Sequence, residues 1–228
     1  MSMNKKDFSF IVLIPAYNEE LHIKKLIEDV KKYADNILVV DDGSQDKTVD
    51  ILKETRVNYL VHEQNAGKGA SLVDGFKYLL NKDFDYVLTM DADGQHAPSD
   101  IPAFTQCAAL SNADIVVGNR MSDTSGMPLD RYLTNRFTSW VISKMAHQKI
   151  SDSQCGFRLI SKKVLENIDI ETKNYDTESE ILVKASRNGF KIAEVPVKTI
   201  YGNESSDIHK IKDTIRFFKL VFNLKKKR

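Results

Sequence analysis

The chain has 228 residues, of which 42% are hydrophobic and 29% are charged, and these proportions exclude a disordered, collagen-like or coiled-coil protein. A chain of this length can bury the core of one large domain. Its 33 basic and 32 acidic residues give a formal net charge of +1, which argues against a general nucleic-acid-binding protein because such proteins usually carry a strong basic excess.

The first half of the chain alternates between short apolar runs and segments with helical spacing. The first run, at residues 8–14, is typical of a strand buried on both faces of a parallel sheet. Ile23, Ile27 and Val30 then recur at helical spacing. Such alternation predicts βαβ units, and therefore an α/β fold with a mostly parallel sheet flanked by helices. Strands are expected at residues 8–14, 36–40, 58–62, 86–90 and 114–117, and helices at 19–33, 46–55, 66–80 and 98–110.

The regular alternation ends after residue 120. Thr177 and Glu180 have the spacing of a capping box, in which the two side chains bond main-chain N–H groups at the start of a helix. Pro196 favours an edge strand or a bulge in the last strand-like segment. A loop is expected at 122–127, helices at 130–147 and from 176 to about 188, and strand-like segments at 157–160 and 191–200.

The C-terminal segment is strongly basic. Residues 208–228 hold eight basic residues and one acidic residue, a net charge of +7, whereas the preceding residues sum to −6. A basic amphipathic helix here is typical of an element at a membrane surface; a helix packed on the core is the alternative. We expect a catalytic domain at 1–206 and an interfacial helix and tail at 207–228. The apolar stripe of this predicted helix comprises Ile208, Ile211, Ile215, Phe218 and Phe222, and the basic residues Lys212, Arg216 and Lys219 lie off that stripe.

Polar clusters follow four of the predicted strands. In open α/β sheets, ligands bind beyond the carboxyl ends of the strands, so these clusters are expected to meet at one edge. Turn formation explains one such cluster but not readily four. The clusters are residues 15–19, 41–48, 91–96 and 118–120.

The Asp91-x-Asp93 pair is the sharpest of these signals. Two carboxylates that bracket one residue at a strand end can both face a divalent cation. Carboxylate oxygens suit Mg²⁺ or Mn²⁺, which usually retain water and take substrate phosphates as further ligands. Gln95 can add an amide oxygen, whereas His96 is expected to orient a neighbour rather than bind the metal.

Several common sites are absent from the sequence. The 65–69 segment opens a helix, where anions are favoured, but His62 and Gly69 break the P-loop pattern. No dinucleotide-binding glycine motif follows the first strand, and no Gly-x-Ser-x-Gly elbow occurs, so a dehydrogenase and an α/β-hydrolase are unsupported. Cys107 and Cys155 fit neither a disulfide framework nor a zinc site, and reduced thiols in a cytosolic protein are expected.

Six motifs between residues 15 and 158 are similar to those of one known family. They are Pro-Ala-Tyr-Asn-Glu, Asp-Asp-Gly-Ser-x-Asp-x-Thr, Asn-x-Gly-Lys-Gly, Asp-Ala-Asp-Gly-Gln-His, Gly-Asn-Arg and Asp-Ser-Gln-Cys-Gly-Phe-Arg. With these motifs in this order along the chain, the sequence resembles the inverting family 2 glycosyltransferases of GT-A fold. Within them it is most similar to the dolichol-phosphate mannose synthase group, which includes bacterial polyprenyl-phosphate sugar transferases.

The resemblance implies transfer of one sugar from a nucleotide sugar to a polyprenyl or dolichyl monophosphate, with Mg²⁺ or Mn²⁺, by a peripheral protein at the cytoplasmic membrane face. One of Asp41 and Asp42 would bond the base and the other would shape the turn. The metal would be held by Asp91, Asp93 and Gln95. The implied nucleotide-sugar-binding residues are Pro15, Tyr17, Glu19, Asp41, Asp42, Lys68, Asp91, Ala92 and Asp93.

A lipid monophosphate is already an anion, so it needs cations to hold it rather than a general base. Arg120 and Arg158 lie inside matched motifs, and guanidinium groups bind phosphate bidentately. The implied phosphate-binding residues are Arg120, Arg131, Asn135, Arg136 and Ser139. The implied catalytic residues are Asp91, Asp93, Arg120, Arg158 and Glu178.

Two other functions stay open at this point. A family 2 enzyme that acts on a hydroxyl acceptor needs a carboxylate base, for which Asp176 or Glu178 is placed. A non-catalytic subunit that binds a nucleotide sugar or docks on a membrane is the second. The sequence also leaves open the sugar, the choice between GDP and UDP, and whether a membrane-spanning partner subunit or a second copy of the chain is required.

Overall fold

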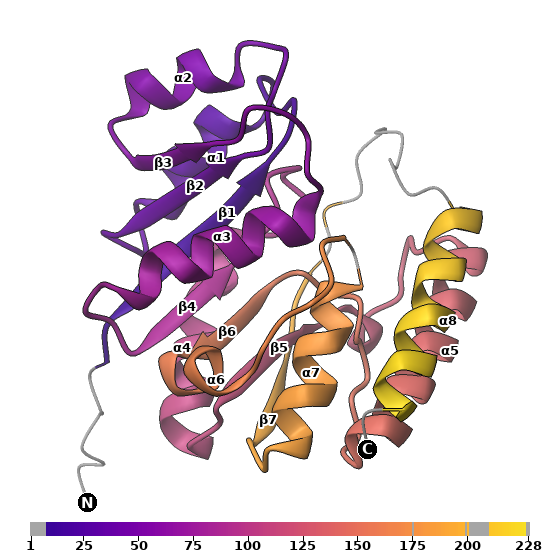
Figure 1. Ribbon diagram of the computed structural model, residues 1–228. Helices are drawn as coiled ribbons and strands as arrows, with labels where there is room; N and C mark the ends of the chain where they lie inside the picture. Colours follow the sequence, from indigo (N-terminus) through magenta and orange to yellow (C-terminus); the bar gives the residue numbers. More distant parts are fainter. Residues whose placement is uncertain (1–7, 175, 199, 201–209, 227–228) are drawn as a thin grey trace, which may run out of the picture.

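The computed structural model describes residues 8–174, 176–198, 200 and 210–226, with the side chains of 210–215 and 225–226 outside the description. Seven strands form one sheet in the order β3-β2-β1-β4-β6-β5-β7 (Figure 1). The strands are β1 (Phe10–Ala16), β2 (Ile37–Asp41), β3 (Asn58–Val61), β4 (Tyr86–Thr89), β5 (Ile115–Asn119), β6 (Arg158–Ser161) and β7 (Ile192–Pro196). The helices are α1 (Ile23–Val30), α2 (Thr48–Thr55), α3 (Lys68–Leu80), α4 (Ile101–Ser111), α5 (Leu129–Ala146), α6 (Lys162–Asn167), α7 (Thr177–Arg187) and α8 (Lys210–Lys226), with short 3₁₀ helices at Pro98–Asp100 and Arg120–Ser122.

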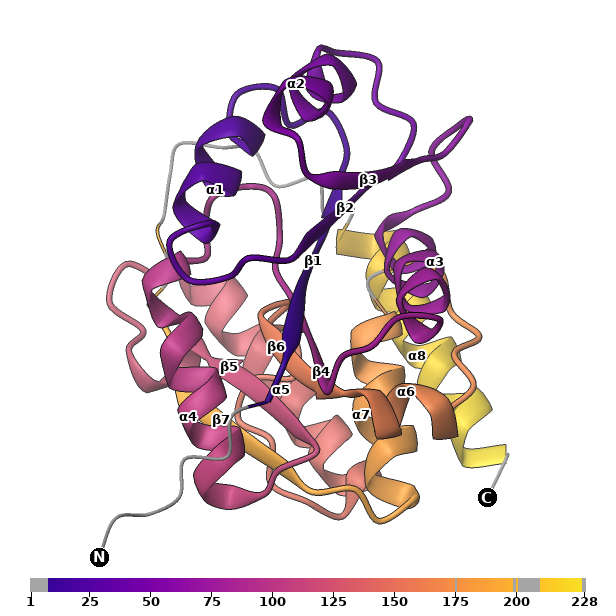
Figure 2. The same cartoon turned by 90° about the vertical axis from the view of Figure 1, so that its left-hand side faces the viewer.

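Helices cover both faces of the sheet, as the strand–helix alternation predicts. Figure 2 shows α1 and α4 on one face and α3, α6 and α7 on the other. Strand β1 pairs in parallel with both β2 and β4, and the central residues of these strands are fully buried. Because these strands run in the same direction, their carboxyl ends, with the polar clusters that follow them, meet at one edge.

The second half of the chain completes the sheet with a change of direction. Strand β6 runs antiparallel between β4 and β5, and β7 lies at the outer edge, parallel to β5. Of the two positions predicted from Pro196, an edge strand or a bulge, the edge strand is confirmed, because β7 is the outermost strand of the sheet. The antiparallel β6 brings the segment before it, residues 152–157, beside the end of β4.

The capping box predicted for Thr177 and Glu180 is wrong. The helix begins at Thr177, but the Glu180 carboxylate accepts hydrogen bonds from the main-chain N–H groups of Glu171 and Thr172 and pairs with Lys184 at 2.6 Å. Because the Glu180 carboxylate accepts hydrogen bonds from the segment before α7, it does not cap the N–H groups at the start of its own helix. The short helix α6 was not predicted, because six residues carry too little periodicity.

The C-terminal helix α8 has a buried face that differs from the predicted stripe. Phe217, Leu220 and Leu224 are buried in the hydrophobic core, whereas Phe218 and Phe222 are more than half exposed. Arg187 of α7 donates a hydrogen bond to the carbonyl of Leu224, which ties the end of α8 to the domain. The other stripe positions, Ile208, Ile211 and Ile215, lie outside the described side chains. Among the described helices, none is long and apolar enough to cross a bilayer.

Candidate active site

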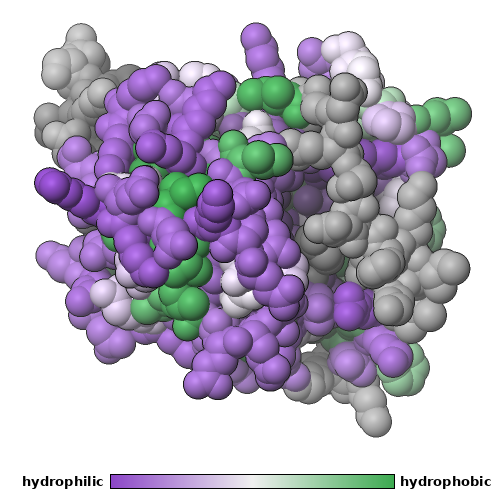
Figure 3. Space-filling view, turned by 90° about the horizontal axis from the view of Figure 1, so that it is seen from above, coloured by the Kyte–Doolittle hydropathy of each residue, from purple (hydrophilic) through white to green (hydrophobic). Residues whose placement is uncertain are grey.

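A cleft of about 450 Å³ opens at the carboxyl ends of β1, β2 and β4 and at the first turn of α3. We call it the strand-end cleft. Figure 3 views the molecule from above, toward this edge of the sheet, and hydrophilic side chains cover most of the described part of that face. The cleft is lined by Pro15, Ala16, Tyr17, Glu19, Asp42, Asn65, Gly67, Lys68, Ser71, Asp91, Ala92, Asp93, Asn174 and Arg216.

A lysine is held between two carboxylates in this cleft. The ammonium group of Lys68, on the first turn of α3, lies 2.6 Å from Asp91 Oδ1 and 2.8 Å from Glu178 Oε1 on α7. Burial alone would raise the pKa of Asp91, but Lys68 lowers that pKa to about 2. Burial and the neighbouring Asp91 charge raise the pKa of Asp93 above its usual value. The cleft therefore holds a fixed anion at Asp91 and a second carboxylate beside it.

His96 acts on Asp91 through the main chain. Its Nδ1 accepts a hydrogen bond from the Asp91 N–H at 3.2 Å, and its ring stacks on Phe157. Burial lowers the pKa of His96, which favours the neutral ring with its proton on Nε2. This position matches the expected orienting function. Gln95 is not among the described residues that line the cleft, and its main-chain N–H donates to Asp93 Oδ1.

The donor set fits a hard divalent cation that shares its coordination with a ligand. Asp91 and Asp93 both line the cleft, and the ammonium group of Lys68 already occupies a cation position against Asp91. Within the described part of the chain, no three His, Cys, Asp or Glu side chains form a metal-binding group. A cation here would therefore need oxygens from water and a bound phosphate, which is how Mg²⁺ is usually held.

The two acidic residues after β2 have different surroundings. Asp42 lines the cleft, and its carboxylate accepts hydrogen bonds from the main-chain N–H groups of Ala66 and Gly67 and contacts His62 Nδ1 at 2.8 Å. Asp41 is fully buried, and one of its oxygens accepts from the Ser44 N–H within the turn. Of the two, Asp42 is thus the one at the cleft, and it also fixes the loop that leads into α3.

Gly156 leaves the space that the Asp91 carboxylate occupies. A Cβ at this position would lie 2.6 Å from Asp91 Oδ1 and 2.7 Å from Oδ2, and Thr89 Oγ donates to the Gly156 carbonyl, which holds the segment in place. We expect Gly156→Ala to displace Asp91 and to weaken Mn²⁺ binding in the presence of a nucleotide by roughly tenfold or more. Isothermal titration with Mn²⁺ measures this. Gly189→Ala is the control for a general loss of stability, because alanine is strained at its φ of +80° but nothing lies within 4 Å of the added Cβ. Equal affinities for Gly156→Ala and the parent protein would contradict this packing argument.

The two motif arginines lie inside the protein and not at an open phosphate site. Arg158 is 1% exposed and donates to the main-chain carbonyls of Cys155, Ser153 and Glu178. Arg120 forms a bidentate pair with Asp152 at 2.7 and 2.9 Å. Neither is among the described cleft-lining residues. The expectation that Arg158 holds a phosphate finds no support in its position, which is that of a structural residue.

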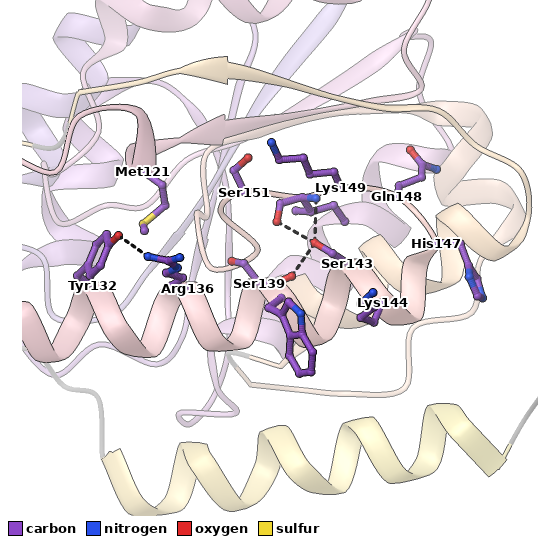
Figure 4. Close-up of a pocket in the computed structure, with 12 residues that line it drawn as sticks. Met121, Tyr132, Arg136, Ser139, Ser143, Lys144, His147, Gln148, Lys149 and Ser151 are labelled. Atoms are coloured by element: carbon purple, nitrogen blue, oxygen red, sulfur yellow. Dashed lines mark hydrogen bonds between the residues drawn. The ribbon is translucent and has the colours of Figure 1, made fainter.

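The other predicted phosphate-binding residues all lie on helix α5, but they do not share the same surroundings. Arg136 and Ser139 line a second, open hollow of about 680 Å³, the α5 groove, and Arg136 donates to the hydroxyl of Tyr132. Figure 4 shows α5 on one side of this groove and the segment after it on the other. Asn135 is buried, whereas Arg131 lines neither hollow among the described residues. The groove is lined by Met121, Tyr132, Arg136, Ser139, Trp140, Ser143, Lys144, His147, Gln148, Lys149, Ile150 and Ser151.

Three cleft residues lie outside all the motifs that the sequence analysis identified. Ser71 is fully buried on the first turns of α3, and its hydroxyl has no hydrogen-bond partner among the described residues. Asn174 comes from the segment before α7, and Arg216 comes from α8. No local pattern marks Ser71 or Asn174, and Arg216 was expected only as one of the basic residues off the apolar stripe of the C-terminal helix. Only the packing of distant segments brings these side chains to the cleft.

Comparisons with known proteins show the family to which this fold belongs. The family model described as glycosyl transferase family 2 matches residues 11–169. A Methanococcus voltae UDP-N-acetylglucosamine–dolichyl-phosphate N-acetylglucosaminyltransferase is 36% identical over 83% of this chain and 85% of its own. The polyprenol monophosphomannose synthase of Mycolicibacterium smegmatis is 30% identical over 82% of this chain and 76% of its own.

A solved structure shows the same fold. Glucosyl-3-phosphoglycerate synthase from Mycobacterium tuberculosis, in complex with UDP, aligns with a TM-score of 0.75 at 18% identity over 96% of this chain and 81% of that one. Other structures of that synthase contain UDP with Mn²⁺ or with Mg²⁺. The mostly parallel sheet with its flanking helices is therefore a GT-A fold. The chain belongs to glycosyl transferase family 2 and is a glycosyltransferase.

Proposed function

We propose that the protein transfers one sugar from a nucleotide sugar to a polyprenyl or dolichyl monophosphate at the cytoplasmic face of a membrane. The observation that carries this proposal is the α5 groove, which combines Arg136, Lys144 and Lys149 with the exposed ring of Trp140. Cationic side chains beside an exposed aromatic ring suit a phosphate joined to a long apolar chain. Two relatives whose names specify dolichyl-phosphate and polyprenol-phosphate products or acceptors add support.

The strand-end cleft would hold the nucleotide sugar. Pro15, Tyr17, Glu19 and Asp42 line the part at the ends of β1 and β2, where a base and ribose would lie. A divalent cation, Mg²⁺ or Mn²⁺, held by Asp91 and Asp93 would neutralise the departing diphosphate. Ala92 lies between them on the cleft wall.

The surroundings of Glu178 favour a phosphate acceptor over a hydroxyl acceptor. A hydroxyl must lose a proton to a nearby base, whereas a phosphate monoester attacks as the anion that it already is. Glu178, one of the two candidate bases, is 6% exposed and its carboxylate is held by Lys68 at 2.8 Å. The α5 groove also begins, at Met121, just beyond the carboxyl end of β5, on the edge of the sheet that carries the strand-end cleft.

The membrane surface is proposed to meet the outer side of α5. Leu129, Leu133, Phe137 and Trp140 recur at helical spacing, each at least 49% exposed, and the rings of Phe137 and Trp140 pair at 6.4 Å. A stripe of this kind beside basic side chains is typical of a helix lying in a bilayer interface. The exposed aromatic residues of α8 would add to it.

Removal of this stripe is expected to weaken membrane binding. The double variant Leu133→Ser with Phe137→Ser should bind vesicles that contain anionic lipid roughly tenfold or more weakly, because two apolar side chains no longer enter the interface. Vesicle co-sedimentation measures the change. The matched control is Leu21→Ser with Leu110→Ser, which removes two exposed leucines from the turn before α1 and from α4. Equal loss in both double variants would exclude α5 as the membrane-facing element.

The proposed reaction is tested with a panel of UDP- and GDP-linked sugars carrying labelled sugar. The protein is incubated with vesicles that contain a polyprenyl phosphate, with Mg²⁺ or Mn²⁺ or with EDTA. We expect label from one donor to enter the lipid phase only when the metal is present. Label that reaches a glycan or soluble sugar but never the lipid phase would overturn the proposal.

A further inference from the structure

The Lys68 side chain occupies the place at Asp91 where a bound cation would be expected. Its ammonium group is in direct contact with Asp91 at 2.6 Å and with Glu178 at 2.8 Å, and only about a fifth of the side chain is exposed. We propose that Lys68 is an internal counter-cation of the strand-end cleft, and that its displacement makes the binding of a divalent cation and of a nucleoside diphosphate cooperative. This inference rests on the donor-binding half of the proposed function and concerns how that donor is admitted.

The main chain around Lys68 is closely packed, so a displacement of Lys68 is expected to involve its side chain. Gly67 precedes the helix with a φ of +100°, a conformation that suits glycine. A Cβ on Gly69 would clash with Thr177 Oγ1 and would lie 2.5 Å from the Lys173 carbonyl carbon. The N–H of Ala70 donates to the Lys173 carbonyl at 3.1 Å. The first turn of α3 therefore packs directly against the segment that leads into α7.

A divalent cation and the Lys68 ammonium group compete for the same oxygen. Asp91 Oδ1 is in contact with Lys68, and a metal ion bound there would lie beside a positive charge in a partly buried site, where repulsion is poorly screened. A metal ion that binds alone must displace the Lys68 ammonium group from Asp91, and it brings no anion to take the place of that carboxylate beside Lys68. This opposes binding of the metal by itself.

A nucleoside diphosphate removes that penalty. Its phosphate oxygens supply the anionic partner that Lys68 loses at Asp91, and they also supply metal ligands that two carboxylates do not provide. Glu178 keeps the other side of the ammonium group and so limits how far it moves. The α7 main chain is fixed at this point, because the Glu178 carbonyl accepts from Arg158. Lys68 thus acts as a positioning residue whose ammonium group exchanges the Asp91 carboxylate for the diphosphate.

The test measures Mn²⁺ affinity without any sugar acceptor. Free Mn²⁺ is titrated by electron paramagnetic resonance against the parent protein and Lys68→Met, with no nucleotide, with UDP and with GDP. We expect Lys68→Met to bind Mn²⁺ alone roughly tenfold more tightly. Its Mn²⁺ affinity with nucleotide bound should change little, so the factor by which a nucleotide tightens Mn²⁺ binding should fall roughly tenfold. Lys77→Met, which removes an exposed lysine from the same helix, should leave both values unchanged.

Weaker or unchanged Mn²⁺ binding by Lys68→Met in the absence of nucleotide would overturn the inference, since a purely structural lysine gives no gain in metal affinity. If Lys68→Met does not fold, the double variant Lys68→Met with Glu178→Gln takes its place, because it leaves no unpaired carboxylate at Glu178. The same gain is expected. Failure of lipid transfer would leave this result standing, since the titration contains no acceptor.

Discussion

Asp91→Asn is expected to lower the rate of sugar transfer on the order of 10²–10³-fold, the range seen when one charge-stabilising group is removed from an active site. The carboxylate faces the strand-end cleft, is ionised with a pKa of about 2, and is oriented by His96 through its main-chain N–H. The amide keeps the shape of the side chain but removes the charge that would hold a divalent cation at the departing diphosphate. Steady-state kcat/KM for the preferred donor measures the loss.

The neighbouring Asp93→Asn is expected to act in the same direction, because both carboxylates line one cleft. Asp83→Asn, an exposed aspartate before β4, is the control and should leave the rate unchanged. Circular dichroism establishes that each variant is folded. Full turnover by an Asp91→Asn, Asp93→Asn double variant would show that these carboxylates have no part in the chemistry.

Asp152→Ala is expected to produce the largest loss of stability, about 3–5 kcal/mol. Asp152 is 0% exposed and Arg120 is 7% exposed, and their bidentate contacts at 2.7 and 2.9 Å leave the guanidinium no solvent partner if the carboxylate is removed. A buried charge without its partner destabilises the fold far more than the pair stabilises it. Urea unfolding, monitored by circular dichroism, measures the change.

The double variant Arg120→Met with Asp152→Leu supplies the control for that prediction. It removes both charges, so it should recover most of the stability lost in Asp152→Ala. A loss below about 1 kcal/mol in Asp152→Ala would mean that water or another group replaces the carboxylate. In that case Arg120 would not be held in the interior as the contacts indicate.

The sheet and the catalytic edge could be predicted because their signals are local. Buried parallel strands are apolar runs, and the polar residues that stop them lie at the ends where ligands bind. Asp91 and Asp93 follow β4 directly, so their exposure to the cleft follows from the strand assignment alone.

Contacts between distant segments could not be predicted from the sequence. The contact of Lys68 with Glu178 joins residues 110 positions apart, and the Arg120–Asp152 pair joins the end of β5 to the segment before β6. A motif shows that an arginine is present but not whether it faces a phosphate or, as for Arg158, three carbonyl groups. The buried face of α8 likewise depends on the surface of the domain against which the helix packs, and the spacing of apolar residues in its sequence did not identify that face.

The acceptor is the central claim, and a matched pair of lipids tests it most directly. The protein is given the labelled donor that it prefers, with Mn²⁺, and either a polyprenyl phosphate or the polyprenol of the same chain length. We predict label on the polyprenyl phosphate and none on the polyprenol, because the proposed acceptor site would bind the phosphate anion and the Glu178 carboxylate is paired with Lys68. Label on the polyprenol or on a glycan hydroxyl, with none on the lipid phosphate, would contradict this account.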